Sequence, residues 1–588
     1  MNDEASQTPN QDFAAGAGAT RKRQRGHRLP ALVLLAITAL VYGAAITYKF
    51  VTWDDGIHVF KNPYFHPLTW SNVAHFWLAP YEKLYIPLSY TVYAALVVIA
   101  NHFPTPFDQG TDATIDAHVF HIASVGVHLL NTFLVFLIAK RLTRRALPAA
   151  VGTLIFAIHP MQVESVAWVS ELRGLLAALF CLIAMLIYVR LGDEAGNSSV
   201  RLSKCWIRCG ALMVLALLCK PSVLILPIAL LTIGCLFQKR PLLVCARETL
   251  PLLALSLPFL VITHAAQPVL AQVSVPWLER PLIAADALAF YITKLFAPFR
   301  LCIDYSRRPH DVLGHWWGYV TWILPVAVAW TAWRFRDKAP YLLAGAALFA
   351  VVLLPELGLV PFTYQNYSTV ADRYAYLALL GPAFALSILV ARLDATTLWN
   401  AAIALTAVLG LLAVHQSGVW RNSLDLNAAC LAVNPNSAAC HANYGDALYR
   451  CGRYAQARDE FLESIKANPD FEYLYTDLGD VYLALHSYDD AVNCYTYAAF
   501  RNPDNPVQHD KLARALLAAK RYDEAIHEFT TTISLSPHSK SAFIGLGDAC
   551  AGAQRWPDAV LAYRGAIFMG DTGAQTQRKL KHAIEAAK

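Results

Sequence analysis

Residues 31–55 read ALVLLAITALVYGAAITYKFVTWDD, an apolar run followed by two adjacent carboxylates, Asp54 and Asp55. An apolar run of about 20 residues is long enough to cross the hydrocarbon core of a membrane as a helix. No small-residue cleavage site follows it, so we interpret residues 31–49 as a retained span and not as a signal peptide. The segment predicts a membrane protein whose first outer loop begins with a pair of acidic groups.

The composition extends this prediction to most of the chain. Of the 588 residues, 56% are hydrophobic and only 15% are charged, with a mean hydropathy of +0.38. Soluble globular domains carry roughly 25% charged residues. The apolar segments fall within residues 31–416, whereas residues 417–588 have the regular charges of a soluble domain. The net charge of +6 reflects basic flanks of the spans and does not indicate a nucleic-acid partner.

Eleven segments have the length and apolar character of membrane spans. Segments 84–101 and 282–298 are also apolar, and we expect them to lie in or dip into the outer interface. The predicted spans are 31–49, 118–139, 147–165, 174–190, 208–220, 222–238, 249–266, 316–333, 339–355, 374–391 and 397–416.

Lysine and arginine clusters set the predicted orientation of these spans. Cytoplasmic loops carry an excess of basic residues. Placing all the clusters in the cytoplasm requires a cytoplasmic N-terminus and eleven crossings, which puts Asp54, Asp55 and the whole C-terminal domain on the outer face. The clusters are Arg21–Arg28, Lys140–Arg145, Arg190–Arg208, Lys239–Arg240 and Arg334–Lys338.

A 34-residue period runs through the C-terminal part. Pro435, Pro469, Pro503 and Pro537 are each 34 residues apart, and aromatic, alanine and small-residue positions repeat in the same register. Small residues let two antiparallel helices approach closely, aromatics fill the space between them, and proline ends the second helix. This pattern is typical of tetratricopeptide repeats, which bind extended peptides or partner proteins in a concave groove.

Charged residues recur where the predicted spans meet the outer face. A charge at a membrane boundary is costly to desolvate, so each is a candidate for a functional site. The alternatives are a solvated acidic loop for the aspartate pair, an internal ion pair for each arginine, and a lysine that snorkels to the interface. The candidates are Asp54, Asp55, His159, Glu164, Arg173, Lys220 and Arg373.

Three histidines, His118, His121 and His128, share one face of the second span. A metal site is one reading, but that span holds no cysteine or carboxylate beside them, so the pattern favours a polar stripe facing a cavity. The twelve cysteines have no metal-binding spacing, and Cys430 and Cys440, which flank Pro435, are the most plausible disulfide pair, with free buried thiols as the alternative.

The order of these motifs resembles the membrane glycosyltransferases with C-terminal tetratricopeptide repeats, whose animal members are the transmembrane and tetratricopeptide-repeat O-mannosyltransferases. The resemblance covers about residues 35–570. It rests on Asp54-Asp55 after the first span, Pro87-Leu88-Ser89, His159-Pro160 with Glu164, Arg173, Lys220-Pro221, and Asp372-Arg373-Tyr374 with Tyr376.

The resemblance implies a fold of the GT-C type and transfer of a sugar, such as mannose, from a polyprenyl-phosphate donor to a protein hydroxyl. It implies that the acidic pair acts at the acceptor, with Asp54 as the base and Asp55 orienting the acceptor. Arg173, Lys220 and Arg373 would bind the donor phosphate, with His159 and Glu164 as further polar groups of the site. Several relatives carry an Asp shortly after the arginine that corresponds to Arg173. This chain has Gly174-Leu175-Leu176 there, so an inactive transferase is an alternative.

The expected molecule is therefore all-α, a polytopic GT-C type bundle of about 11 spans followed by a solenoid of tetratricopeptide repeats. We expect no resident metal or cofactor beyond the lipid-linked donor, although Asp54, Asp55 and Glu164 could hold a divalent ion. The expected partners are the polyprenyl-phosphate sugar, membrane lipid, and a protein or peptide acceptor bound in the repeat groove, and the expected location is a bacterial inner membrane with the repeats in the periplasm.

The other readings are a membrane-anchored repeat scaffold, a glycan transporter and a glycan-directed transferase or ligase. The expected domains are a disordered basic tail (1–30), a membrane domain (31–416), a half-repeat helix (417–436), four repeats (437–572) and a capping helix (573–588).

Overall fold

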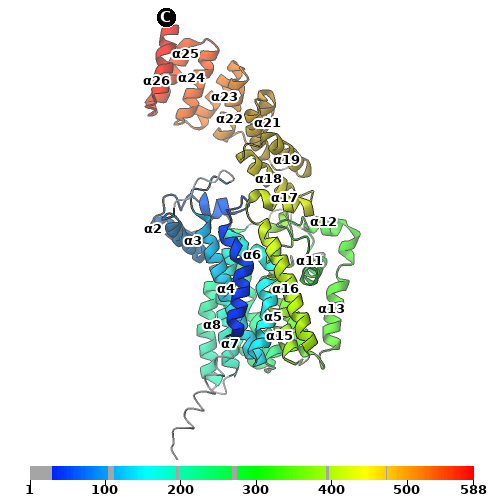
Figure 1. Ribbon diagram of the computed structural model, residues 1–588. Coiled ribbons are helices and arrows are strands. Elements are labelled where there is room, and N and C mark those ends of the chain that lie inside the picture. The colour runs from blue at the N-terminus through cyan, green and yellow to red at the C-terminus, as the bar shows by residue number, and fades with distance from the viewer. Residues whose placement is uncertain are drawn as a thin grey trace, which may run out of the picture. The chain divides into compact units, whose positions relative to one another are not determined.

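The structure is a computed structural model that describes residues 29–103, 111–193, 198–267, 275–392, 396–469, 471 and 473–588 (Figure 1). These residues form helices joined by loops, with two isolated bridges, Phe65–Leu68 and Tyr81–Leu84, in place of strands. The chain divides into two compact units, Met1–Pro435 and Asn436–Lys588. The all-α prediction is therefore confirmed. Residues 1–28 of the predicted tail lie outside the described residues.

The first unit contains a helical bundle with apolar helices of several lengths. In the described residues, five helices are long and apolar enough to cross a membrane, and a sixth span results if one bent pair is counted as a single segment. The five are Leu29–Thr47, α4 (Ala117–Thr143), Val169–Asp193 with α7 (Leu172–Asp193), α10 (Leu242–Ala266), and Trp399–Val419 in α16 (Thr396–Val419).

The other predicted spans correspond to shorter or more polar helices, so eleven crossings remains a prediction. The helices in question are α8 (Ser198–Leu217), Pro221–Phe237, α13 (Ile323–Arg334), Pro340–Glu356 with α14 (Pro340–Leu353), and α15 (Leu380–Arg392). The two apolar segments expected at the interface form α3 (Pro87–Ala100) and α11 (Arg280–Phe296), and α2 (Trp70–Leu78), α12 (Pro309–Gly314) and α17 (Ser423–Val433) complete this unit.

The bent pair consists of α5 (Ala146–Ile158) and the segment Pro160–Ala167, which includes α6 (Val163–Ala167). A proline disfavours the helical conformation of the residue before it. His159 accordingly has extended backbone angles, and the chain turns by 54° at this point. The α5 helix packs against α4, α15 and α16, which lie side by side in Figure 1. The bend directs α6 across the end of the bundle.

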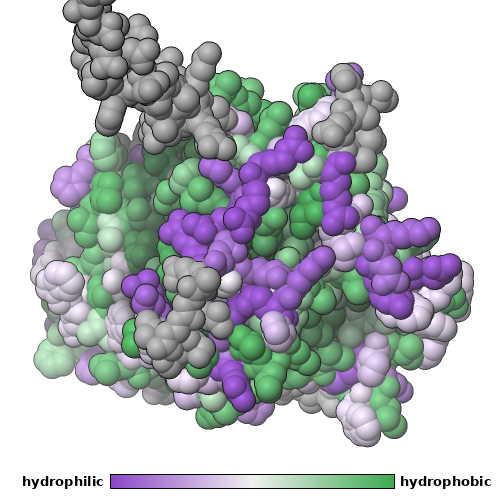
Figure 2. Space-filling view, turned by 90° about the horizontal axis from the view of Figure 1, so that it is seen from below, coloured by the Kyte–Doolittle hydropathy of each residue, from purple (hydrophilic) through white to green (hydrophobic). Residues whose placement is uncertain are grey.

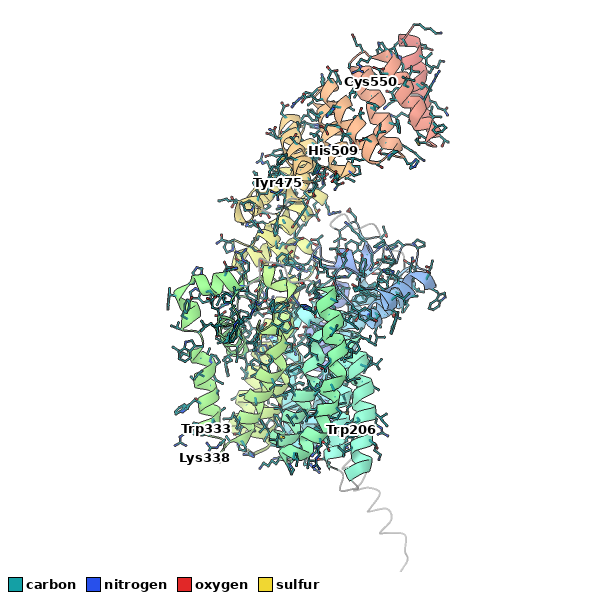
Figure 3. The ribbon with its side chains drawn as sticks, turned by 180° about the vertical axis from the view of Figure 1, so that it is seen from behind. Trp206, Trp333, Lys338, Tyr475, His509 and Cys550 are labelled. Carbon is teal, nitrogen blue, oxygen red and sulfur yellow. The ribbon has the colours of Figure 1, made fainter. Side chains whose placement is uncertain are left out.

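Two of the basic clusters lie at the opposite end of the bundle. Arg141 and Arg144, where α4 ends, both pair with Asp193, where α7 ends. Arg145 donates to the carbonyl oxygen of Ala391 at the end of α15. Figure 2 looks onto this end of the bundle, where hydrophilic side chains gather among apolar ones, and Figure 3 places Lys338 there as well. The clusters Lys140–Arg145 and Arg334–Lys338 therefore lie at the same end of the bundle.

The second unit consists of four antiparallel helix pairs and a final helix. Close packing follows from the repeat pattern: a Cβ added to Gly445 would lie 2.9 Å from the Phe461 ring, and one added to Gly547 would lie 2.4 Å from the Tyr563 ring. The helices are α18 (Ala438–Arg450), α19 (Tyr454–Ala467), α20 (Tyr473–Ala484), α21 (Tyr488–Arg501), α22 (Pro506–Ala518), α23 (Tyr522–Leu535), α24 (Lys540–Gly552), α25 (Trp556–Phe568) and α26 (Ala574–Ala586).

Candidate active site

The two aspartates after the first span have different surroundings. Asp55 is buried, and its carboxylate accepts hydrogen bonds from the backbone N–H of Val51 at 3.0 Å and from Ser170, whose N–H lies at 3.0 Å and whose hydroxyl lies at 2.6 Å. Burial raises the pKa of Asp55 to about 6, although these three hydrogen bonds oppose the shift. Asp55 therefore ties the loop to the start of the Val169–Asp193 helix.

Asp54 is half-buried, and within the described residues its carboxylate accepts no hydrogen bond from a neighbouring group. Its negative charge acts on Arg173 and on His58. Burial lowers the pKa of His58 to about 4, so this imidazole is neutral near pH 7, and its Nδ1 lies 3.0 Å from the Tyr90 hydroxyl. Asp54 is thus the acidic group of the pair that remains available to a substrate.

Glu171 is the centre of a buried network of cations. One carboxylate oxygen lies 2.9 Å from Lys220 Nζ, and the other lies 3.3 Å from the Arg173 guanidinium and 3.8 Å from Nε of Arg373. The three predicted phosphate-binding residues are therefore brought together, although each is already paired with a carboxylate. The partner of Arg173 is Glu171, the carboxylate two residues before it.

Glu164 pairs instead with Arg373. The Arg373 guanidinium donates to Oε1 of Glu164, while the backbone N–H of Asp372 donates to Oε2 at 3.1 Å. The bend at His159-Pro160 positions this contact, because Glu164 lies on α6. Arg373 also faces the Tyr364 ring, whose centroid is 4.2 Å from the guanidinium carbon. In the described residues Arg373 forms no ion pair with its neighbour Asp372, which accepts a hydrogen bond from the Tyr305 hydroxyl at 2.8 Å.

The remaining predicted histidines contact other parts of the bundle. His159 accepts a hydrogen bond from the Met161 N–H and lies 3.2 Å from the carbonyl oxygen of Leu295, so it supports the bend. His118, His121 and His128 contact Asp116, the Lys49 carbonyl and the Tyr376 hydroxyl, respectively. No three His, Cys, Asp or Glu side chains in the described part of the chain are grouped as metal ligands.

The candidates named from the sequence omit Glu171 and one further carboxylate of this region, Glu356. Glu356 is half-buried, and its side chain forms a hydrogen bond with Ser222. The positive charges of Lys220 and Arg373 act on its carboxylate. It ends the apolar helix Pro340–Glu356, so the signal that identified Asp54, a charge at the end of an apolar run, also applied here. Arg173, Lys220 and Arg373 therefore face Glu164, Glu171 and Glu356.

Comparisons with known proteins find a repeat family and two similar transferases. A family model of the tetratricopeptide repeat matches residues 417–470 and 511–574. Protein O-mannosyl-transferase TMTC4 of Mus musculus is 23% identical over 440 residues, which cover 66% of this chain and 58% of TMTC4. Protein O-mannosyl-transferase TMTC1 of Mus musculus is 29% identical over 191 residues, or 31% of this chain and 19% of TMTC1. The chain therefore spans less than two thirds of the length of either relative.

Solved structures of repeat proteins resemble part of the chain. YrrB, described as a TPR protein with an unusual peptide-binding site, is 20% identical with a TM-score of 0.26, covering 33% of this chain and 92% of YrrB. MamA from Desulfovibrio magneticus RS-1 is 17% identical with a TM-score of 0.24, covering 27% of this chain and 85% of MamA. The resemblance expected from the motifs is thus confirmed: the chain is similar to the protein O-mannosyl-transferases TMTC4 and TMTC1 and carries a C-terminal tetratricopeptide-repeat domain.

Proposed function

We propose that this chain is a membrane glycosyltransferase that moves a sugar from a polyprenyl-phosphate donor to a hydroxyl group of a protein. The observation that carries the proposal is that the two aspartates differ in their hydrogen bonding. Asp55 is held by three hydrogen bonds, while Asp54 has an unengaged carboxylate whose charge acts on Arg173. Mannose is the sugar suggested by the names of the two relatives.

In this mechanism Asp54 is the general base. It accepts the proton of the acceptor hydroxyl as the oxygen attacks the anomeric carbon of the sugar. The bond from that carbon to the phosphate oxygen breaks, and its electron pair leaves with the polyprenyl phosphate. A single displacement inverts the anomeric centre. Asp55 keeps the loop in place, so that Asp54 faces the acceptor.

The cations of the Glu171 network are proposed to stabilise the charge that develops on the leaving phosphate. Arg173, Lys220 and Arg373 are already oriented by Glu171 and Glu164, so little reorganisation is needed when the donor binds. The same pairing argues against a metal at Asp54, Asp55 and Glu164, because Asp55 and Glu164 accept hydrogen bonds from N–H donors.

The repeat unit is proposed to recruit the protein acceptor. Family repeats of this type present a concave surface to extended peptides, and the similarity of YrrB concerns a peptide-binding repeat protein. We further propose that the site and the repeats face the outside of a bacterial inner membrane. Arg173 lies at the start of α7, whereas Asp193 at the other end of this helix pairs with the basic residues Arg141 and Arg144.

The test is transfer by the purified chain from a panel of polyprenyl-phosphate sugars, with mass spectrometry of the peptide product and of released polyprenyl phosphate. We expect Asp54→Asn to reduce transfer by at least about 100-fold, because a positioned general base contributes about that much. Asp311→Asn, which changes a carboxylate paired with Arg308 outside the site, is the matched control and should transfer at the wild-type rate. Wild-type transfer by Asp54→Asn would remove Asp54 as the base. If the folded wild type transfers no sugar from any donor, a repeat scaffold on an inactive transferase is the better reading.

A further inference from the structure

Two aromatic side chains adjoin Asp54 and have no part in the chemistry proposed above. Trp53 precedes Asp54 in the first outer loop, and Tyr367 belongs to the loop that leads to Arg373. The two ring centroids are 6.4 Å apart, and the ring planes meet at 61°. Trp53 is half-buried and Tyr367 is 37% exposed, so both residues keep part of their surface open. Two loops that are far apart in the sequence thus place an aromatic pair beside the proposed base.

A row of aromatic rings runs from Arg373 to this pair. The guanidinium carbon of Arg373 lies 4.2 Å from the centroid of the Tyr364 ring. The Tyr364 and Tyr367 centroids are 5.7 Å apart, and the Tyr367 ring in turn contacts Trp53. The charge of Asp54 acts on Tyr367. The row therefore begins at a proposed phosphate-binding cation and ends at the proposed base.

The two ends of this row face different substrates. In a displacement that inverts the anomeric carbon, the attacking and leaving oxygens lie on opposite faces of the sugar ring. The general base contacts the attacking oxygen, which the acceptor supplies. Arg373 therefore faces the donor phosphate, whereas Trp53 and Tyr367, which adjoin Asp54, face the residues that flank the acceptor hydroxyl.

The chemistry of the aromatic pair favours an apolar residue beside that hydroxyl. Aliphatic side chains and proline rings pack on aromatic rings and bury apolar surface. The charges of Asp54 and Asp304 both act on Tyr367, so an acidic side chain is repelled. A basic side chain would favour the ionised form of Asp54 and so make it a weaker base. An apolar residue has neither disadvantage.

We infer that Trp53 and Tyr367 form a binding site for the residue next to the acceptor hydroxyl and that they select an aliphatic residue or a proline at that position. The inference rests on the proposed function and adds to it a class of acceptor sequence. The pair determines specificity and takes no part in the transfer of the proton. The repeat unit would then recruit the protein, and the aromatic pair would select the hydroxyl.

The experiment compares acceptor peptides that differ only beside the hydroxyl. The full-length protein in lipid nanodiscs receives the panel of polyprenyl-phosphate sugars and alanine-based peptides with a single threonine. Valine, proline, glycine, lysine or glutamate stands on both sides of the threonine. We expect kcat/KM to be at least about tenfold higher for the valine and proline peptides than for the glycine peptide, the effect of burying one aliphatic side chain. The lysine and glutamate peptides should not exceed the glycine peptide.

Variants of the aromatic pair are judged by the ratio of kcat/KM for the valine peptide to that for the glycine peptide. Trp53→Ala and Tyr367→Ala should each lower this ratio to about one, whereas Trp53→Phe and Tyr367→Phe should retain most of it. A general loss of folding or catalysis lowers both rates alike and leaves the ratio unchanged. Tyr319→Ala removes a ring that is 52% exposed in the segment between α12 and α13, and this matched control should keep the wild-type ratio.

Anisotropy of fluorescein-labelled valine and glycine peptides measures binding without transfer and separates the two ways of failing. Transfer that depends on Asp54 but has the same ratio in the wild type and both alanine variants removes the aromatic site only. Tighter binding of the valine peptide that depends on Trp53, without transfer from any donor, removes the enzyme activity only. The inference is also overturned if the wild type distinguishes the peptides in neither transfer nor binding, or if it prefers glycine, lysine or glutamate.

Discussion

Asp54 and Asp55 illustrate how far residue identity alone can lead. The sequence places two carboxylates together after an apolar run, and either could serve as the base by its chemistry. The distinction comes from Ser170, which is 115 residues away and contributes two donors to Asp55. A serine at the start of a span gives no sequence signal for that contact. The same holds for the Glu171 and Lys220 pair, which depends on two helices meeting.

Ser170→Ala tests whether Asp55 works in its ionised form. Removing the hydroxyl donor deletes a hydrogen bond to the charged carboxylate, so the pKa of Asp55 should rise above its value of about 6. A charge-assisted hydrogen bond contributes about 1.5 to 3 kcal/mol, so the acid limb of the pH–rate profile should move upward by about one unit or more. The measurement is the transfer rate between about pH 5 and pH 9. An acid limb at the wild-type position would show that Asp55 ionisation does not control the rate.

Glu171→Gln tests the role of the central carboxylate in holding the cations together. Breaking one partner of a buried ion pair costs about 3 to 5 kcal/mol, because the remaining charges are left uncompensated. We therefore expect a clear drop in the midpoint of thermal unfolding in detergent. The double variant Glu171→Gln/Lys220→Met removes one of the stranded cations and should recover part of the loss. Equal midpoints for the single variant and the wild type would mean that solvent, and not Glu171, compensates these cations.

At the scale of helices, the 34-residue period and the proline positions predict well where the helices of the repeat unit end. Pro469, Pro503 and Pro537 each lie two residues after the end of a helix, as expected from the 34-residue register. The membrane helices are less predictable, because apolar runs define where a helix can form but not where it stops. The predicted span 147–165 is divided by the 54° bend at His159. The role of the bend is visible only in the structure, where it brings Glu164 of α6 into contact with Arg373.

Asp477 on α20 gives a prediction for the repeat unit. Burial raises the pKa of Asp477 to about 6, with Asp480 adding to the shift and Lys511 and Arg450 opposing it. A carboxyl group with a raised pKa in the folded state contributes stability below its unfolded pKa, and this contribution is lost as the pH rises through about 6. Asp477→Asn should therefore match the wild type near pH 4 and exceed its free energy of unfolding above pH 6, by at most about 3 kcal/mol.

The measurement is urea unfolding of residues 436–588 at a series of pH values. Asp504→Asn, which changes an exposed carboxylate of the same unit, serves as the control and should give a difference that does not vary with pH. A constant difference for Asp477→Asn as well would contradict the assigned cause.

For the whole molecule, the loop charges predicted which ends of the helices lie together. The ends of α4, α7 and α15 meet through Arg144 with Asp193 and Arg145 with Ala391, and Arg392 lies over the Tyr341 ring. The number of crossings was harder to predict, because some helices that are too short to span alone, such as α14 and α15, still pack inside the bundle. The distribution of basic residues predicts the side of the membrane on which a loop lies. Whether a given helix crosses the membrane also depends on how it packs against its neighbours.

Thiol labelling can test which side of the membrane each end faces. Cys451 in the repeat unit is exposed and free. If the repeats are outside, a membrane-impermeant maleimide should label Cys451 on intact cells, and Cys451→Ser should abolish that labelling. The matched variant Cys451→Ser/Lys338→Cys places the thiol at the basic end, where labelling should require permeabilisation of the cells (Figure 3). Because basic loops favour the cytoplasmic side, the opposite pattern would mean that an even number of crossings precedes the repeats and that the proposed acceptor would have to be a cytoplasmic protein.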